Sequence, residues 1–120
     1  MIGGTTAGTT TYAANGRIGN YTRKGREVTA SGVVEWTNAT GTGNMRLSLP
    51  FTSASGTRRY YAASVYTDGI TIGANYTPYG ALFAGVDYIE LYVPANNAGS
   101  TAIAVEVAGT VIYTVTYFLS

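Results

Sequence analysis

The chain contains no cysteine and no histidine. Without cysteine it has neither a disulfide framework nor a thiolate metal site. Without histidine it has no imidazole metal site, and the Ser-His-Asp and Cys-His arrangements of nucleophilic catalysis are impossible. The glycine-rich runs at 41–46 and 69–76 lie between predicted strands, with no helix N-terminus to hold a phosphate. We therefore expect no metal and no cofactor.

Carboxylates are also few, although a pair of them can hydrolyse a glycosidic bond. Asp87 and Glu90 are the closest acidic pair in sequence, but side chains three residues apart on a strand point to opposite faces. The remaining acidic residues are Glu27, Glu35, Asp68 and Glu106. We expect a protein that is not an enzyme, while an active site formed between subunits stays open.

Charged residues make up 11% of the chain, against about 25% in an average soluble domain. The net charge of +1 gives no basic field for a phosphate backbone, so we expect no nucleic-acid partner. No apolar run has the length of a membrane span, and we expect no membrane insertion. A surface with little charge and 11 tyrosines favours coverage by further copies or a partner. The alternative is a neutral, threonine-rich β surface.

Polar and apolar side chains alternate between residues 27 and 37, the signature of a half-buried strand. One predicted face carries Val28, Ala30, Gly32, Val34 and Trp36, and the other carries Glu27, Thr29, Ser31, Val33 and Glu35. The Lys24-Gly25 step before this strand is typical of a tight hairpin turn.

Eight or nine short strands are predicted, at about residues 10–14, 18–23, 27–37, 44–49, 60–66, 70–74, 88–93, 102–107 and 111–119. Short strands separated by glycine-rich turns are typical of a β-sandwich or barrel, with the jelly roll as the most economical eight-stranded form. The predicted fold is all-β, a single jelly-roll-like β-sandwich at residues 12–120. Residues 1–11 are predicted to form a flexible N-terminal arm or a strand-like extension that pairs with a neighbour.

The last strand is apolar or aromatic on both faces. Val111, Tyr113, Val115, Tyr117 and Leu119 share one face, with Ile112 and Phe118 on the other. We expect such a strand either at the centre of the sandwich or in a contact between subunits, because an exposed apolar edge invites aggregation.

Several tyrosines cluster around two predicted loops, at 53–59 and 75–80. Aromatic rings at one end of a sandwich can stack on a glycan, and neighbouring arginines can add charge-assisted hydrogen bonds. The candidate contacts for a glycan or a partner are Arg58, Arg59, Tyr60, Tyr76 and Tyr79. The alternative is that these tyrosines are half-buried interface residues.

The run GNYTRKGREVTASGVVEWTNATGTGNMRLSLPF, at 19–51, contains a GxYTRxG hairpin, a TGTG turn and a strand that ends in LPF. It resembles a domain found at the C-terminal tips of tailed-phage tail fibres and tailspikes, and the preceding GGTTAGTTTY is similar to that family's entry sequence. The family usually has a small apolar residue where Lys24 stands. The resemblance implies a trimeric β-sandwich on the virion surface, and related small sandwiches serve as capsid decoration proteins.

The trimer implied by this resemblance requires an interface between subunits. The candidate interface residues are Trp36, Tyr113, Tyr117 and Phe118, aromatic side chains on the two most apolar strands. Trp36 ends the apolar face of its strand, so a core or interface anchor is favoured over a platform for a sugar.

Two functions remain open at this stage. A capsid decoration protein would bind the major capsid protein, with Gly3, Gly4, Thr5 and Thr6 of the arm as candidate contacts. The receptor-binding tip of a fibre or spike would instead bind a host surface glycan. Because the chain begins at Met1 and contains neither a shaft nor a tail-attachment region, we expect the decoration function and keep the tip as the alternative.

Overall fold

A computed structural model describes residues 1–57, 59–72, 76–95 and 99–120. These residues form nine strands and no helix. The strands are β1 (Ile2–Gly3), β2 (Thr10–Lys24), β3 (Glu27–Ala39), β4 (Met45–Ser48), β5 (Tyr61–Asp68), β6 (Tyr79–Leu82), β7 (Tyr88–Ala95), β8 (Gly99–Ala102) and β9 (Gly109–Phe118). The predicted all-β class is therefore confirmed. Over the same residues, no helix is long and apolar enough to cross a membrane.

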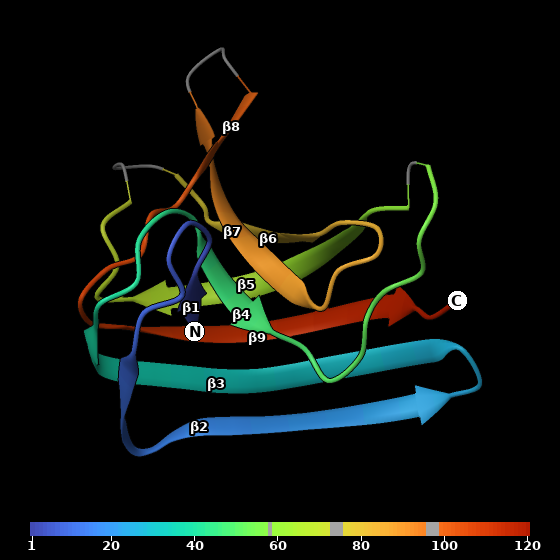
Figure 1. Ribbon diagram of the computed structural model, residues 1–120, viewed down its shortest axis with the longest axis horizontal. Coiled ribbons are helices and arrows are strands. Elements are labelled where there is room, and N and C mark those ends of the chain that lie inside the picture. The colour runs from blue at the N-terminus through green and yellow to red at the C-terminus, as the bar shows by residue number, and fades with distance from the viewer. Residues whose placement is uncertain (58, 73–75, 96–98) are drawn as a thin grey trace.

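All nine strands belong to one antiparallel sheet with the order β1-β4-β7-β6-β5-β9-β3-β2, and β8 pairs with β7 beside this path. The sheet curls until it is nearly barrel-shaped, so the fold is sandwich-like or barrel-like. In Figure 1 the long strands β2, β3 and β9 run side by side, and β4 and β7 cross them obliquely. The two groups of strands enclose the core.

The β2–β3 hairpin and its pairing with β9 follow the sequence pattern closely. Val28, Ala30 and Trp36 are buried on the inner face of β3, whereas Glu27 and Glu35 are exposed on the outer face. The predicted alternation is confirmed. The two strands predicted at 10–14 and 18–23 instead form the single strand β2, which is interrupted by irregular pairing around Tyr12.

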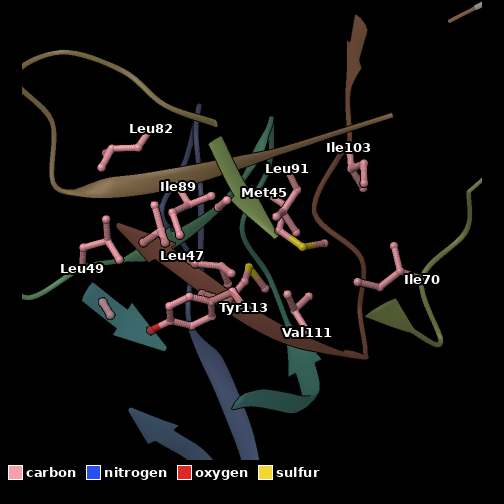
Figure 2. Packing of buried hydrophobic residues seen from close by; sticks show 14 of the residues in the cluster. Met45, Leu47, Leu49, Ile70, Leu82, Ile89, Leu91, Ile103, Val111 and Tyr113 are labelled. Atoms are coloured by element: carbon pink, nitrogen blue, oxygen red, sulfur yellow. The ribbon is translucent and has the colours of Figure 1, made fainter. Parts of the chain in front are cut away.

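The core is built from side chains that β9 and β3 share with the shorter strands. Figure 2 shows Leu47 of β4 and the β7 residues Ile89 and Leu91 above Val111 and Tyr113 of β9. All five side chains are buried. They form one continuous cluster, which includes Val28 and Trp36 as well.

Strand β9 lies between β3 and β5, which is the central position, the first of the two alternatives expected for it. Its outer face is nevertheless open in the single chain, with Ile112 44% and Phe118 40% exposed. The two apolar faces of β9 thus have different environments: one face packs in the core, and the other is an exposed apolar surface.

Residues 1–11, predicted as a flexible arm, are hydrogen-bonded to the rest of the fold. Strand β1 pairs with β4, and the backbone N–H groups of Thr5 and Thr6 donate to the carbonyl oxygen of Thr42. Met1 is buried, and its amino group donates to the Tyr12 hydroxyl at 2.7 Å. This segment lies against the turn at 40–44.

Three differences from the predicted strands concern β6, residues 70–74 and β8. Strand β6 lies at Tyr79–Leu82, within a segment predicted as a turn and the residues after it. A strand was predicted at 70–74, but residues 70–72 are not in a strand, and 73–74 lie outside the described residues. The strand predicted at 102–107 is shorter and earlier, as β8.

Candidate functional site

Four aromatic side chains form a row on the outer face of β6 and β7 and in the loops beside them. Their ring centroids are 5.6 Å apart for Tyr60 and Phe83, and 6.2 Å apart for Phe83 and Tyr92. Tyr92 stacks on Tyr79, its register partner on β6, at 5.9 Å. We call these four residues the aromatic row. Tyr60 is 62% exposed and Phe83 is 37% exposed, so the row is open to a ligand.

The position of this row follows from the packing of β6 on the core. Gly80 and Leu82 are buried on the inner face, which turns Tyr79 and Ala81 outward. A side chain at Gly80 would bring its Cβ within 2.6 Å of the Ile89 side chain. The glycine therefore holds β6 close to the core, and its tyrosine neighbour is presented on the surface.

A shallow hollow of about 250 Å³ lies within the aromatic row. It is lined by Tyr79, Ala81, Phe83, Tyr92 and Ser100. Because the side chain of Ala81 is small, the space between Tyr79 and Phe83, its neighbours on the same face of the chain, stays open. The Tyr79 and Ser100 hydroxyls are hydrogen-bonded to each other at the rim. We call this feature the aromatic hollow.

An ion pair borders the hollow on β7 and β4. The Arg46 guanidinium and the Glu90 carboxylate are 2.8 Å apart, and Tyr92 donates a hydrogen bond of 2.7 Å to the same carboxylate. The Asn44 amide donates to it at 3.4 Å. Arg46 also lies over the ring of Tyr88, 4.2 Å from its centroid. Aromatic rings and a satisfied ion pair therefore occupy one continuous surface.

The titration behaviour of this network is set by burial and by its hydrogen bonds. Burial raises the pKa of Glu90, but the Tyr92 hydrogen bond and the Arg46 guanidinium outweigh it and hold the pKa below its usual range. Burial and the bond to Glu90 raise the pKa of Tyr92 to about 12. At neutral pH Glu90 is thus a carboxylate and Tyr92 is a neutral phenol.

The predicted glycan-contact residues are divided by the structure. Tyr60 and Tyr79 belong to the aromatic row, and Arg59 is exposed. Tyr76 is half-buried, and Arg58 lies outside the described residues. Sequence reasoning missed Phe83 and Tyr92. The signal for Tyr92 was its period-two spacing from Tyr88 and Glu90, which places all three on one face of β7.

Three of the four predicted interface residues are core residues, which corrects that prediction. Trp36, Tyr113 and Tyr117 are 1%, 8% and 0% exposed in the single chain. The Trp36 indole donates to the Glu106 carbonyl at 2.9 Å, and the Tyr117 hydroxyl donates to the Phe51 carbonyl at 3.0 Å. Their apolar faces meet the chain's own core. The fourth residue, Phe118, is exposed.

The predicted capsid-contact residues are likewise divided. Gly3 is buried and paired with Met45, and Gly4 donates its backbone N–H to the Asn44 carbonyl. Thr5 and Thr6 are exposed.

A row of apolar side chains, three of them exposed and Val33 half-buried, crosses the outer face of the long strands. Ile18 pairs in register with Val33, Val33 with Ile112, and Ile112 with Tyr66, so the four lie side by side on β2, β3, β9 and β5. Ile18 and Tyr66 are 53% and 61% exposed. We call these residues the outer apolar row. The next residues along the strands toward the β2–β3 turn are polar, for example Ser31 and Thr114.

Carboxylates do not gather into a metal site in the part of the chain that the structure describes. Glu35 and Asp68 border an open hollow of about 340 Å³ near Trp36 and Gly109. Both carboxylates lie on strands that flank β9, where Thr110 stands between them in register. This arrangement brings together two acidic residues that are far apart in sequence, but no third ligand joins them among the described residues.

No protein-family model matches the chain, and no curated protein matches it in sequence. Among solved structures, the fold is similar to part of the Dettilon tailspike protein (gp208), with a TM-score of 0.69 and 16% identity over 93% of this chain. The chain spans 21% of that protein's length. This likeness is one of fold: the strands are arranged as in a portion of a phage tailspike protein.

Proposed function

We propose that the protein is a non-enzymatic structural protein of a tailed-phage virion and forms a receptor-binding module at the tip of a tail fibre or tailspike. The observation that carries this proposal is the fold likeness to a tailspike protein over 93% of the chain. The GxYTRxG, TGTG and LPF motifs support it independently, because they point to the same group of virion surface domains. The module would lie on the virion surface.

The partner that suits this module is a glycan on the host surface. Aromatic rings held in a fixed arrangement at a surface stack on the apolar faces of sugar rings, and the aromatic row has two exposed rings, Tyr60 and Phe83, beside two half-buried ones. Glu90 and Arg46 are already paired with each other, so they stabilise the surface rather than act on a substrate.

The proposed module is a homotrimer. The resemblance to trimeric virion domains and the low charge of the chain support this proposal. The outer apolar row takes the place of the interface that was predicted at the buried aromatic residues. Its exposed side chains, such as Ile112 and Tyr66, are suited to contact a second copy.

Capsid decoration, the function expected from the sequence, is the rival to this proposal. In that function, a free N-terminal arm would make the contact with the major capsid protein. Because Gly4, Thr5 and Thr6 donate their backbone hydrogen bonds within the chain, the arm has fewer groups to offer a capsid. The tip function is favoured for this reason and because of the tailspike fold.

Immunogold electron microscopy of intact virions tests the proposal. Antibodies raised against the recombinant chain should label the tail end of the particle, and the free protein should bind host cells and compete with phage adsorption. Label spread over the capsid would favour the decoration function. Virions without any label would exclude both functions.

A further inference from the structure

We infer that the aromatic hollow is the seat of a single neutral pyranose ring, which enters between Tyr79 and Phe83 above Ala81. The inference rests on the proposed function, because it takes the ligand from a glycan of the host surface. It also names the residues that receive the sugar and the chemical class of sugar that they accept.

The shape of the hollow is the first step. Tyr79 and Phe83 are four residues apart, and the small side chain of Ala81 stands between them on the same side of the chain, so a gap separates the two aromatic side chains. Tyr92 closes this gap from the neighbouring strand, nearly parallel to Tyr79 and perpendicular to Phe83. A pyranose ring that enters the gap meets aromatic carbon with its C–H groups.

Hydrogen-bonding groups lie where the hydroxyls of such a ring would be. The Tyr79 and Ser100 hydroxyls stand at one rim, and each can still accept or donate a further bond. The Tyr92 hydroxyl donates its hydrogen bond to Glu90, so the phenol oxygen can still accept a hydrogen bond from a sugar hydroxyl. An apolar floor with hydroxyls at its edge is complementary to a sugar ring.

Charge decides the class of sugar. The five residues that line the hollow are uncharged. Glu90 is hydrogen-bonded to Tyr92 of the hollow, and its cationic partner Arg46 is held by the carboxylate and by the Tyr88 ring. A sugar carboxylate placed here would have the buried Glu90 carboxylate behind Tyr92 and no cation among the residues that line the hollow. The hollow therefore favours a neutral sugar over a uronic or sialic acid.

The size of the hollow sets the extent of the ligand. Its volume of about 250 Å³ is below the range of about 300–1,000 Å³ that encloses a drug-sized ligand. It accommodates one ring, and the neighbouring ring of a polysaccharide would reach Tyr60, whose ring continues the row. A site that binds a single sugar ring binds weakly, and several copies of the protein on one particle raise the effective affinity.

Saturation-transfer NMR with the intact chain tests the inference. The probes are the methyl pyranosides of glucose, galactose and mannose, with methyl glucuronide as the acidic counterpart. We expect transfer to the ring protons of at least one neutral glycoside, and a weaker signal from the glucuronide. A81L should fill the hollow from its floor and weaken binding about tenfold, comparable to the loss of a strong aromatic contact.

The matched control is A62L. Ala62 is the register partner of Ala81 on β5 and is exposed, but it does not line the hollow, so A62L should bind like the wild type. If A81L does not fold, Y79A replaces it, with Y21A as the control, because Tyr21 is 56% exposed and lies outside both the hollow and the outer apolar row. Equal binding by the hollow variant and the wild type overturns the inference, as does the absence of transfer to all three neutral glycosides or a preference for the glucuronide.

The virion experiment separates this inference from the proposed function. If gold labels the tail but no sugar signal is seen, the tip function is supported and the aromatic hollow is not its binding site. Label on the capsid together with a sugar signal lost in A81L removes the tip function and leaves the sugar site.

Discussion

Gly32 on β3 lies directly opposite Tyr113 on β9, and the tyrosine ring covers the space that a side chain at Gly32 would fill. A Cβ added at Gly32 would lie 2.7 Å from the Ile18 carbonyl oxygen and 3.0 Å from both Cε1 and the hydroxyl oxygen of Tyr113. The ring can lie across the inner face of the sheet only because residue 32 is a glycine. This contact places a tyrosine of the central strand β9 beside the groove between β2 and β4.

The first prediction concerns this pair. Gly32→Val should destabilise the protein by about 1–3 kcal/mol, because the added side chain overpacks the site against the Ile18 carbonyl oxygen and the Tyr113 ring. Urea unfolding followed by tyrosine and tryptophan fluorescence measures the change. Gly19→Ala is the control, since a Cβ there would have its nearest neighbours at 3.9 Å. An equal loss in both variants would contradict this explanation.

The second prediction concerns pH. The pKa of Glu90 is lowered in the folded state. The ionised carboxylate therefore contributes its full stabilisation above the pKa that a glutamate has in the unfolded chain, about 4.3. The contribution is lost as the pH falls through the lower, folded-state pKa. Glu90→Gln should therefore reduce the free energy of unfolding at pH 7 by about 1–3 kcal/mol and flatten its fall below pH 5.

Thermal unfolding between pH 3 and pH 8 measures this effect. The control is Glu27→Gln, which changes an exposed carboxylate at the β2–β3 turn. If the acid dependence of the Glu90 variant matches that of the wild type, the ion pair with Arg46 is not the cause of the acid sensitivity.

The third prediction concerns the N-terminal segment. Deleting residues 2–9 should destabilise the fold by about 2 kcal/mol or more. The deletion removes β1 from the edge of β4, and Met1 can no longer occupy its buried position. Chemical denaturation of the truncated chain measures the loss. Thr6→Ala, which shortens an exposed side chain and keeps the backbone bonds, is the control. Unchanged stability after the deletion would mean that the segment behaves as the flexible arm predicted from the sequence.

The long strands could be predicted from sequence because their alternation extends over many residues. Strand β3 has 13 residues and β9 has 10, enough for the period of two to exclude other structures. Strand β6 has four residues, follows Pro78 and contains Gly80, so the same residues are also typical of a turn. Its existence depends on pairing with β5 and β7, which the local sequence does not encode.

The functional surface was only partly predictable for a related physical reason. Alternation tells which residues share a face, but it does not tell whether that face meets the chain's own core or another molecule. Tyr117 is therefore an interface candidate in the sequence although it is a core residue, and for Trp36 the sequence leaves core and interface as alternatives. The contact between Phe83 and Tyr92 depends on how β6 and the residues after it lie beside β7, and only the three-dimensional structure supplies this information.

The last prediction concerns self-association through the outer apolar row. The wild-type protein should have the mass of a trimer in light scattering at micromolar concentration. Ile112→Glu should shift it to the monomer, because the charge would be buried among Val33, Tyr66 and the apolar surface of a second copy. Its free energy of unfolding at low concentration should change little, since Ile112 is 44% exposed in the single chain.

Thr114→Glu is the matched control for this prediction. Thr114 is the next outward-facing residue on β9, two positions along in the polar row with Ser31 and Ser64, so the same charge is added to the same face. If the outer apolar row forms the contact, Thr114→Glu weakens the trimer less than Ile112→Glu does. Equal dissociation by both variants would indicate a general effect of charge on the sheet. A monomeric wild type would remove both the trimer and the role of this row, because no second copy would then cover the exposed isoleucines.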